Sequence, residues 1–177
     1  MNLQENFESE ELVALARLDM EKQDFSSALA KLKSAVAMEN ASTDSYSMLA
    51  KVYAQLGLYE KAIAQFEVYL QRAPEALVEK FQLGMAQFDA KKTTEALATW
   101  GELLISHPDF PPALYYKSLA LVQEGMKEPA IETLAHLIQT AAADNLYCER
   151  AQQILQDLQG EKASKISVAR KGTNVKH

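Results

Sequence analysis

Apolar residues recur along this chain at three- and four-residue intervals, the spacing of one face of an α-helix. Polar residues fill the positions between them, so successive stretches predict amphipathic helices. The 177 residues include only 6 Gly and 5 Pro, which favours long helices over many short strands joined by turns. The pattern therefore predicts an all-α protein, and a hydrophobic content of 48% allows it a buried core.

The pattern itself repeats at a constant interval of about 34 residues. Alanines recur at this interval, and a large apolar residue follows each of them four positions later. The alanines are Ala28, Ala62, Ala96 and Ala130, and the large residues are Leu32, Phe66, Trp100 and Leu134. A small residue lets two helices approach closely, and the large residue fills the space between neighbouring helix pairs. Each repeat is therefore predicted to be a helical hairpin.

Other residues predict where the helices begin and end. Pro74 and Pro108 are separated by the same interval as the alanines, and proline ends a helix because its ring clashes with the preceding turn. Gly57 and Gly125 fall between the paired helices, where a short loop favours a residue that adopts a left-handed conformation.

A helical hairpin of about 34 residues with these small, aromatic and proline positions resembles the tetratricopeptide repeat (TPR). The resemblance is weaker in the outer repeats, where Asp19 replaces an aromatic residue, Asn40 a proline and Lys117 a leucine. It implies a right-handed superhelical solenoid of four hairpins, at residues 9–42, 43–76, 77–110 and 111–144.

The remaining segments flank the four repeats. Residues 1–8 are a short N-terminal extension. Residues 145–159 have the pattern of a helix with one apolar and one polar face. We expect this helix to cap the last repeat. Gly160 is expected to end this helix, and residues 160–177 are expected to be a disordered basic tail because they have few apolar residues and no period.

The net charge of −6 is unevenly distributed. Residues 161–177 contain five Lys or Arg and one Glu, giving +4, so the other residues carry −10. An acidic body disfavours nucleic acid as a partner, because phosphate backbones bind basic surfaces. The sparse cations of the tail fit a role in solubility. The alternatives are contact with an anionic membrane, with nucleic acid or with the acidic body.

The residues also indicate a compartment. The single cysteine, Cys148, is expected to be an inert, partly buried thiol that fits a reducing environment. No signal peptide is evident, and no apolar run is long enough for a transmembrane segment. We therefore expect a cytoplasmic protein.

The first helices of such repeats line a concave groove, and the resemblance implies which residues face it. The expected groove is polar early in the chain and apolar later, and a large apolar patch indicates an interaction site. Its partner-binding residues are expected to be Arg17, Met48, Lys51, Phe81, Gln82, Met85, Phe88, Tyr115, Tyr116 and Leu119. The alternative is that some of these side chains pack between neighbouring first helices.

We found no catalytic or metal site in the sequence. His107, His136 and His177 lack the spacing that places two ligands on one helix face. There is no glycine-rich phosphate loop, and no nucleophile stands with a base. We therefore expect a protein that is not an enzyme and needs no cofactor.

The predicted function is a protein–protein interaction module: an adaptor, a scaffold or a dedicated chaperone that binds a partner polypeptide in its groove. A groove that captures a C-terminal carboxylate is disfavoured, because Val13, Met48 and Val78 stand where polar groups would be needed. Two alternatives stay open: a homo-oligomer in which one molecule binds the next, and a chaperone of the bacterial secretion type, which has three repeats where this chain has four.

Overall fold

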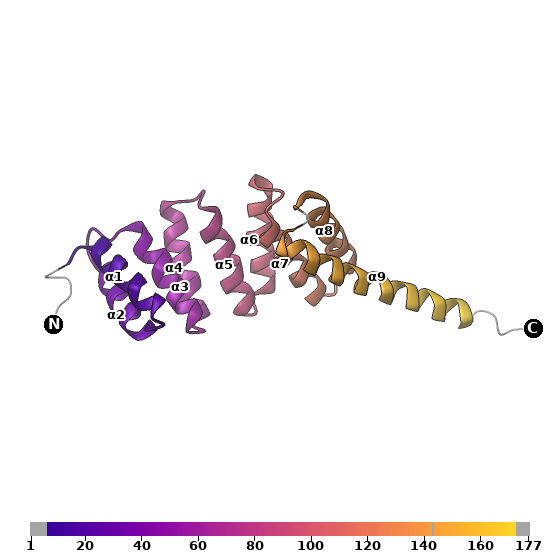
Figure 1. Cartoon of the computed structure of the whole chain (residues 1–177), viewed down its shortest axis with the longest axis horizontal. Helices are drawn as coiled ribbons and strands as arrows, with labels where there is room; N and C mark the ends of the chain where they lie inside the picture. Colours follow the sequence, from indigo (N-terminus) through magenta and orange to yellow (C-terminus); the bar gives the residue numbers. More distant parts are fainter. Residues whose placement is uncertain (1–6, 143, 173–177) are drawn as a thin grey trace, which may run out of the picture. The chain divides into compact units, whose positions relative to one another are not determined.

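The computed structural model describes residues 7–142 and 144–172, and these residues form nine helices and no strand (Figure 1). The first helices of the expected repeats begin at the constant interval seen in the sequence, and so do the second helices. In chain order the helices are α1 (Ser9–Glu21), α2 (Phe25–Val36), α3 (Thr43–Gln55), α4 (Tyr59–Arg72), α5 (Leu77–Asp89), α6 (Thr93–Ser106), α7 (Pro111–Gln123), α8 (Lys127–Thr140) and α9 (Leu146–Gly172).

The chain divides into two compact units, Met1–Thr99 and Trp100–His177. In the first unit α1 packs on α2, and α3 packs on α4. Helix α3 also contacts both α1 and α2, and α4 also contacts α5. In the second unit α7 packs on α8, and α9 contacts both. Consecutive helices therefore pack on one another from α1 to α5 in the first unit and from α7 to α9 in the second.

The repeating pattern forms the centre of both units. The four recurring alanines are fully buried, with 0% of their surface exposed. The large residues four positions later, Leu32, Phe66, Trp100 and Leu134, are also 0% exposed. The sequence correctly predicted both the close contact between paired helices and the side chains that fill the space beside it.

The turns inside the hairpins share a left-handed residue. Gly57 and Gly125 have φ of 70° and 73°, which confirms the conformation expected of them. The equivalent residues of the other two hairpins are Gln23 and Lys91, with φ of 59° and 65°. This conformation is strained for residues with a side chain, so two of the four turns carry a conformational cost that glycine avoids.

Helix α9 differs from our expectation. It does not end at Gly160 but continues to Gly172, so the disordered tail expected from residue 160 is helical to that point. One glycine inside a helix costs only about 1 kcal/mol, and the Glu, Lys and Ala that follow it are good helix formers. Residues 173–177 lie outside the described residues.

No helix in the described part of the chain is both long and apolar enough to cross a membrane.

Candidate interaction surface on the first helices

The fifth residue of the first helix is buried in the first three repeats. Val13, Ser47 and Phe81 are 5%, 4% and 9% exposed, and only Tyr115 is half-buried. Val13 packs in the core cluster of α1, α2 and α3, and Ser47 donates a hydrogen bond to Glu79 of α5. Phe81, expected to bind a partner, has little exposed surface for such a contact. A helical register alone does not distinguish a residue that faces the groove from one that packs beside the next helix.

Lys51 is engaged by an acidic residue that no pattern in the sequence singles out. Its Nζ lies 3.0 Å from Oε1 of Glu79, which comes from α5. The same oxygen accepts a 3.0 Å hydrogen bond from Oγ of the buried Ser47. The positive charge of Lys51 is therefore balanced within the first unit, where it ties α3 to α5.

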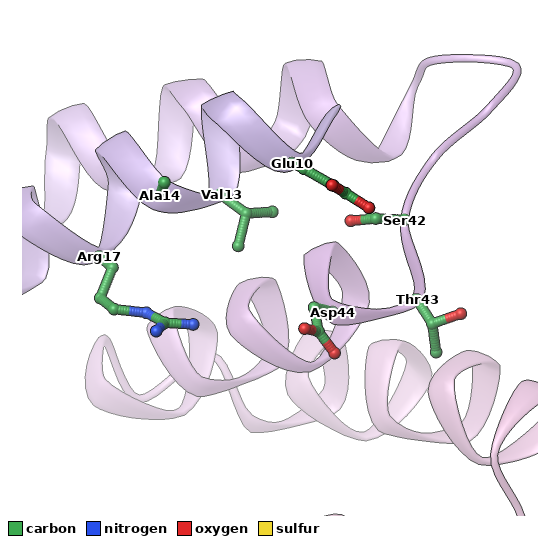
Figure 2. A pocket seen from close by; sticks show the side chains of 7 residues that line it. All are labelled: Glu10, Val13, Ala14, Arg17, Ser42, Thr43 and Asp44. Carbon is green, nitrogen blue, oxygen red and sulfur yellow. The ribbon is translucent and has the colours of Figure 1, made fainter. Parts of the chain in front are cut away.

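Arg17 has a different environment. With Glu10, Val13 and Ala14 of α1, it lines a pocket of about 560 Å³ that Ser42, Thr43 and Asp44 close from the start of α3. Figure 2 shows the side chains of Arg17 and Asp44 facing each other across this pocket. We call this the N-terminal pocket.

The other predicted residues of the first unit are half-buried. Met48 packs against the core cluster formed by α1, α2 and α3. Gln82, Met85 and Phe88 lie partly exposed along α5, and Val78 at the start of that helix is 53% exposed. The apolar later part of the expected groove is thus accessible on α5, although Phe81 is not.

In the second unit the predicted tyrosines form an aromatic cluster. The ring centroids of Tyr115 and Tyr116 are 5.4 Å apart, with their planes nearly perpendicular. Tyr147 of α9 lies 5.3 Å from Tyr115 and 6.3 Å from Tyr116, and Tyr116 lies 6.2 Å from the buried Trp100. Tyr147 is a residue of this surface that sequence reasoning missed, since it lies outside the repeats. Leu119 is half-buried one turn further along α7.

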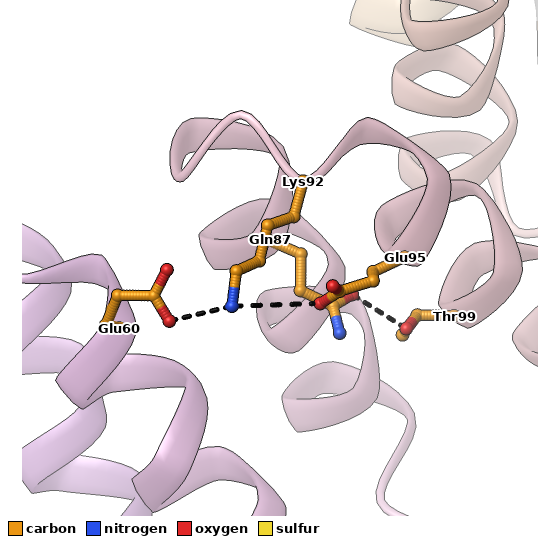
Figure 3. Close-up of polar contacts among 5 residues, drawn as sticks. All are labelled: Glu60, Gln87, Lys92, Glu95 and Thr99. Carbon is orange, nitrogen blue, oxygen red and sulfur yellow. Dashed lines mark hydrogen bonds and ion pairs between the residues drawn. The ribbon is translucent and has the colours of Figure 1, made fainter.

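Polar pairs join the two helices of the α1–α2 hairpin and of the α5–α6 hairpin. Asp19 forms an ion pair with Lys31 between α1 and α2. Gln87, 6% exposed, accepts a 2.7 Å hydrogen bond from Thr99 between α5 and α6 (Figure 3). Both pairs join residues twelve positions apart, so departures from the repeat pattern are compensated within the hairpin.

Lys92 provides a second link near this pair. Its Nζ lies 2.8 Å from Oε2 of Glu60 and 4.0 Å from Oε2 of Glu95 (Figure 3). The hydrogen bond to Glu60 raises the pKa of Lys92. Since Glu60 lies in the first turn of α4 and Lys92 precedes α6, the contact joins consecutive hairpins and has a structural role.

His136 and the acidic side chains were checked as candidates for catalysis or metal binding. In the second unit, Nε2 of His136 lies 3.0 Å from Oδ1 of Asp109, so His136 bridges α8 to the turn before α7. Among the described residues, no three His, Cys, Asp or Glu side chains come together to hold a metal ion.

Two models of the tetratricopeptide repeat match the chain, one over residues 19–82 and the other over residues 81–145. The chain therefore belongs to the tetratricopeptide repeat family. No curated protein matches it.

Solved structures share its fold. A tetratricopeptide repeat protein from Parabacteroides merdae is 19% identical, with a TM-score of 0.76 over 94% of this chain and 68% of that one. A fragment of MamA from Desulfovibrio magneticus RS-1 is 16% identical, with a TM-score of 0.72 over 94% and 97% of the two chains. YrrB, a TPR protein with an unusual peptide-binding site, is 20% identical, with a TM-score of 0.72 over 82% and 74%.

Proposed function

We propose that this chain is a non-catalytic interaction module that binds a segment of a partner polypeptide along its first helices. An adaptor, a scaffold and a dedicated chaperone are the roles that such binding would serve. YrrB, which has the same fold, has a peptide-binding site, and this supports the general mode of action proposed here.

The proposal rests on one observation, the exposure of the ninth residue of each first helix. Arg17 and Lys51 occupy this position in the first two hairpins, and Met85 and Leu119 occupy it in the next two. None of the four is buried, unlike the fifth residues of α1, α3 and α5. Met85 in the first unit and Leu119 in the second are each a partly exposed apolar side chain of the kind that contacts the apolar face of a partner segment.

The test is an affinity pull-down from a lysate with wild type, Met85→Glu and Leu119→Glu. Ile105→Glu is the matched control, because Ile105 is an apolar residue that is 83% exposed on a second helix, α6. A protein retained by wild type and by the control, and lost with both groove variants, is the expected result. Thermal melting would show that all four chains are folded.

Two results would contradict the proposal. Retention of the same proteins by wild type and both groove variants would show that these side chains do not contact a partner. Equal loss with Ile105→Glu would show that capture depends on general surface hydrophobicity.

A further inference from the structure

The N-terminal pocket combines an apolar floor with charged walls. Val13 forms the floor and is 5% exposed. Glu10, Val13 and Arg17 stand at three- and four-residue intervals, so they lie on one face of α1. Figure 2 shows this face opposite the first turn of α3, from which Asp44 extends. The pocket can therefore hold the aliphatic stem of a long side chain while its walls contact the charged end.

Its charged side chains have no partners within the described part of the chain. Glu10, Arg17 and Asp44 make no hydrogen bond or ion pair there. Lys51, by contrast, is paired with Glu79. The two carboxylates and the one guanidinium give the pocket a net negative charge, which favours a cationic ligand.

The chain itself contains a segment of opposite charge. Residues 161–172 form the last part of α9 and contain four Lys or Arg and one acidic residue, Glu161. Leu158 of α9 is buried, and Figure 1 shows the helix running on past the α7–α8 hairpin. At about 1.5 Å per residue, these twelve residues extend the helix by roughly 18 Å.

We propose that the basic end of α9 of one molecule binds the N-terminal pocket of a second molecule. In the pocket, Val13 offers an apolar surface to the aliphatic stem of a lysine, and Glu10 and Asp44 offer carboxylates to its ammonium group. The contact joins two different surfaces, so it assembles copies of this chain head to tail. This site and occupant differ from Met85 and Leu119, the residues proposed above to contact a partner.

The first test measures a fluorescein-labelled peptide of residues 161–177 binding to the full chain at low ionic strength, by fluorescence anisotropy. Glu10→Lys/Asp44→Lys should weaken binding by at least about tenfold. Arg17→Glu removes the only repelling charge of the pocket and should strengthen binding several-fold. This gain is a result that a misfolded or purely structural variant would not give.

The matched control is Glu21→Lys/Glu67→Lys, which changes the net charge of the first unit by the same amount outside the pocket. Its affinity for the peptide should stay within about twofold of wild type. An equal loss in the control pair would assign binding to general charge attraction and overturn the pocket as the site. Absence of peptide binding at low salt would overturn it as well.

The second test is sedimentation equilibrium of the full chain. Wild-type mass should rise with protein concentration and fall when added salt screens the contact. Lys162→Glu/Lys165→Glu and Glu10→Lys/Asp44→Lys should each be monomeric alone, yet form a heterodimer when mixed, because one intact end and one intact pocket remain. A mass that is independent of concentration at low salt would overturn the proposal.

Discussion

At the scale of single residues, the four hairpin turns offer an internal comparison. Gly57 and Gly125 adopt a left-handed conformation at no steric cost, whereas Gln23 and Lys91 adopt it with a side chain. A Cβ built on Gly57 would meet no atom within 4 Å. Exchanges at these positions therefore change backbone conformational energy and leave packing unchanged.

Gln23→Gly should raise the free energy of unfolding by about 0.5–1 kcal/mol, and Gly57→Gln should lower it by a similar amount. The sign differs because the first exchange relieves the left-handed strain and the second introduces it. Thermal or urea unfolding would measure both. Two shifts of the same sign would show that side-chain contacts decide stability at these turns.

The same comparison shows what the sequence could predict at this scale. The two glycines were recognisable, because glycine at a hairpin turn is a direct signal. Gln23 and Lys91 carry no such signal, and only their positions one repeat before and one repeat after Gly57 place them in equivalent turns. Phe81 illustrates a harder case, since its burial depends on how neighbouring helices pack and not on its own register.

At the scale of helices, α2 begins with a cap that depends on pH. The backbone N–H of Ser27 donates a 3.0 Å hydrogen bond to Oδ1 of Asp24. Hydrogen bonds from Ser27 lower the pKa of the Asp24 carboxyl below its ordinary 3.8. Since the folded pKa lies below the unfolded one, this cap contributes its full stability above pH 3.8 and loses it as the pH falls through the folded pKa.

Asp24→Asn should therefore differ from wild type more at about pH 6 than at about pH 3, because asparagine still caps the helix but does not titrate. The measurement is the melting temperature of both proteins across this range. Glu39→Gln removes an exposed carboxylate outside any helix and is the control for loss of charge. A difference between wild type and Asp24→Asn that grows towards low pH would contradict the assignment.

The buried Gln87 tests whether polar pairs stabilise a hairpin. Thr99→Val removes the donor to Gln87 and leaves a buried amide oxygen unsatisfied, which should cost about 1–3 kcal/mol. Gln87→Leu/Thr99→Val should recover most of this loss, because both polar partners are then absent. Thr94→Val, on the exposed face of α6, is the control, and urea unfolding is the measurement. A full loss in the double variant would show that Gln87 stabilises the hairpin by other contacts.

At the scale of the whole molecule, periodicity was the most reliable guide. The constant interval between repeats predicted where helices begin, because burial of one helix face depends on spacing along the chain. The contacts of Lys51 with Glu79 and of Tyr115 with Tyr147 were not predictable in this way. They join residues from different helices, and their geometry depends on how those helices are packed. The extension of α9 past Gly160 was missed because composition was given more weight than helix propensity.

Stability in repeat proteins is a sum of local terms, so damage to one unit should stay local. Trp100→Ala removes a fully buried side chain from the second unit and should cost roughly 3–5 kcal/mol. Phe66→Ala removes the residue at the same repeat position in the first unit. Hydrogen exchange should then show lost protection in α7 and α8 for Trp100→Ala, and in α3 and α4 for Phe66→Ala. A uniform loss of protection across α1–α8 in both variants would contradict this expectation. It would show that the chain unfolds as one cooperative unit and that the contacts within each unit do not set its stability independently.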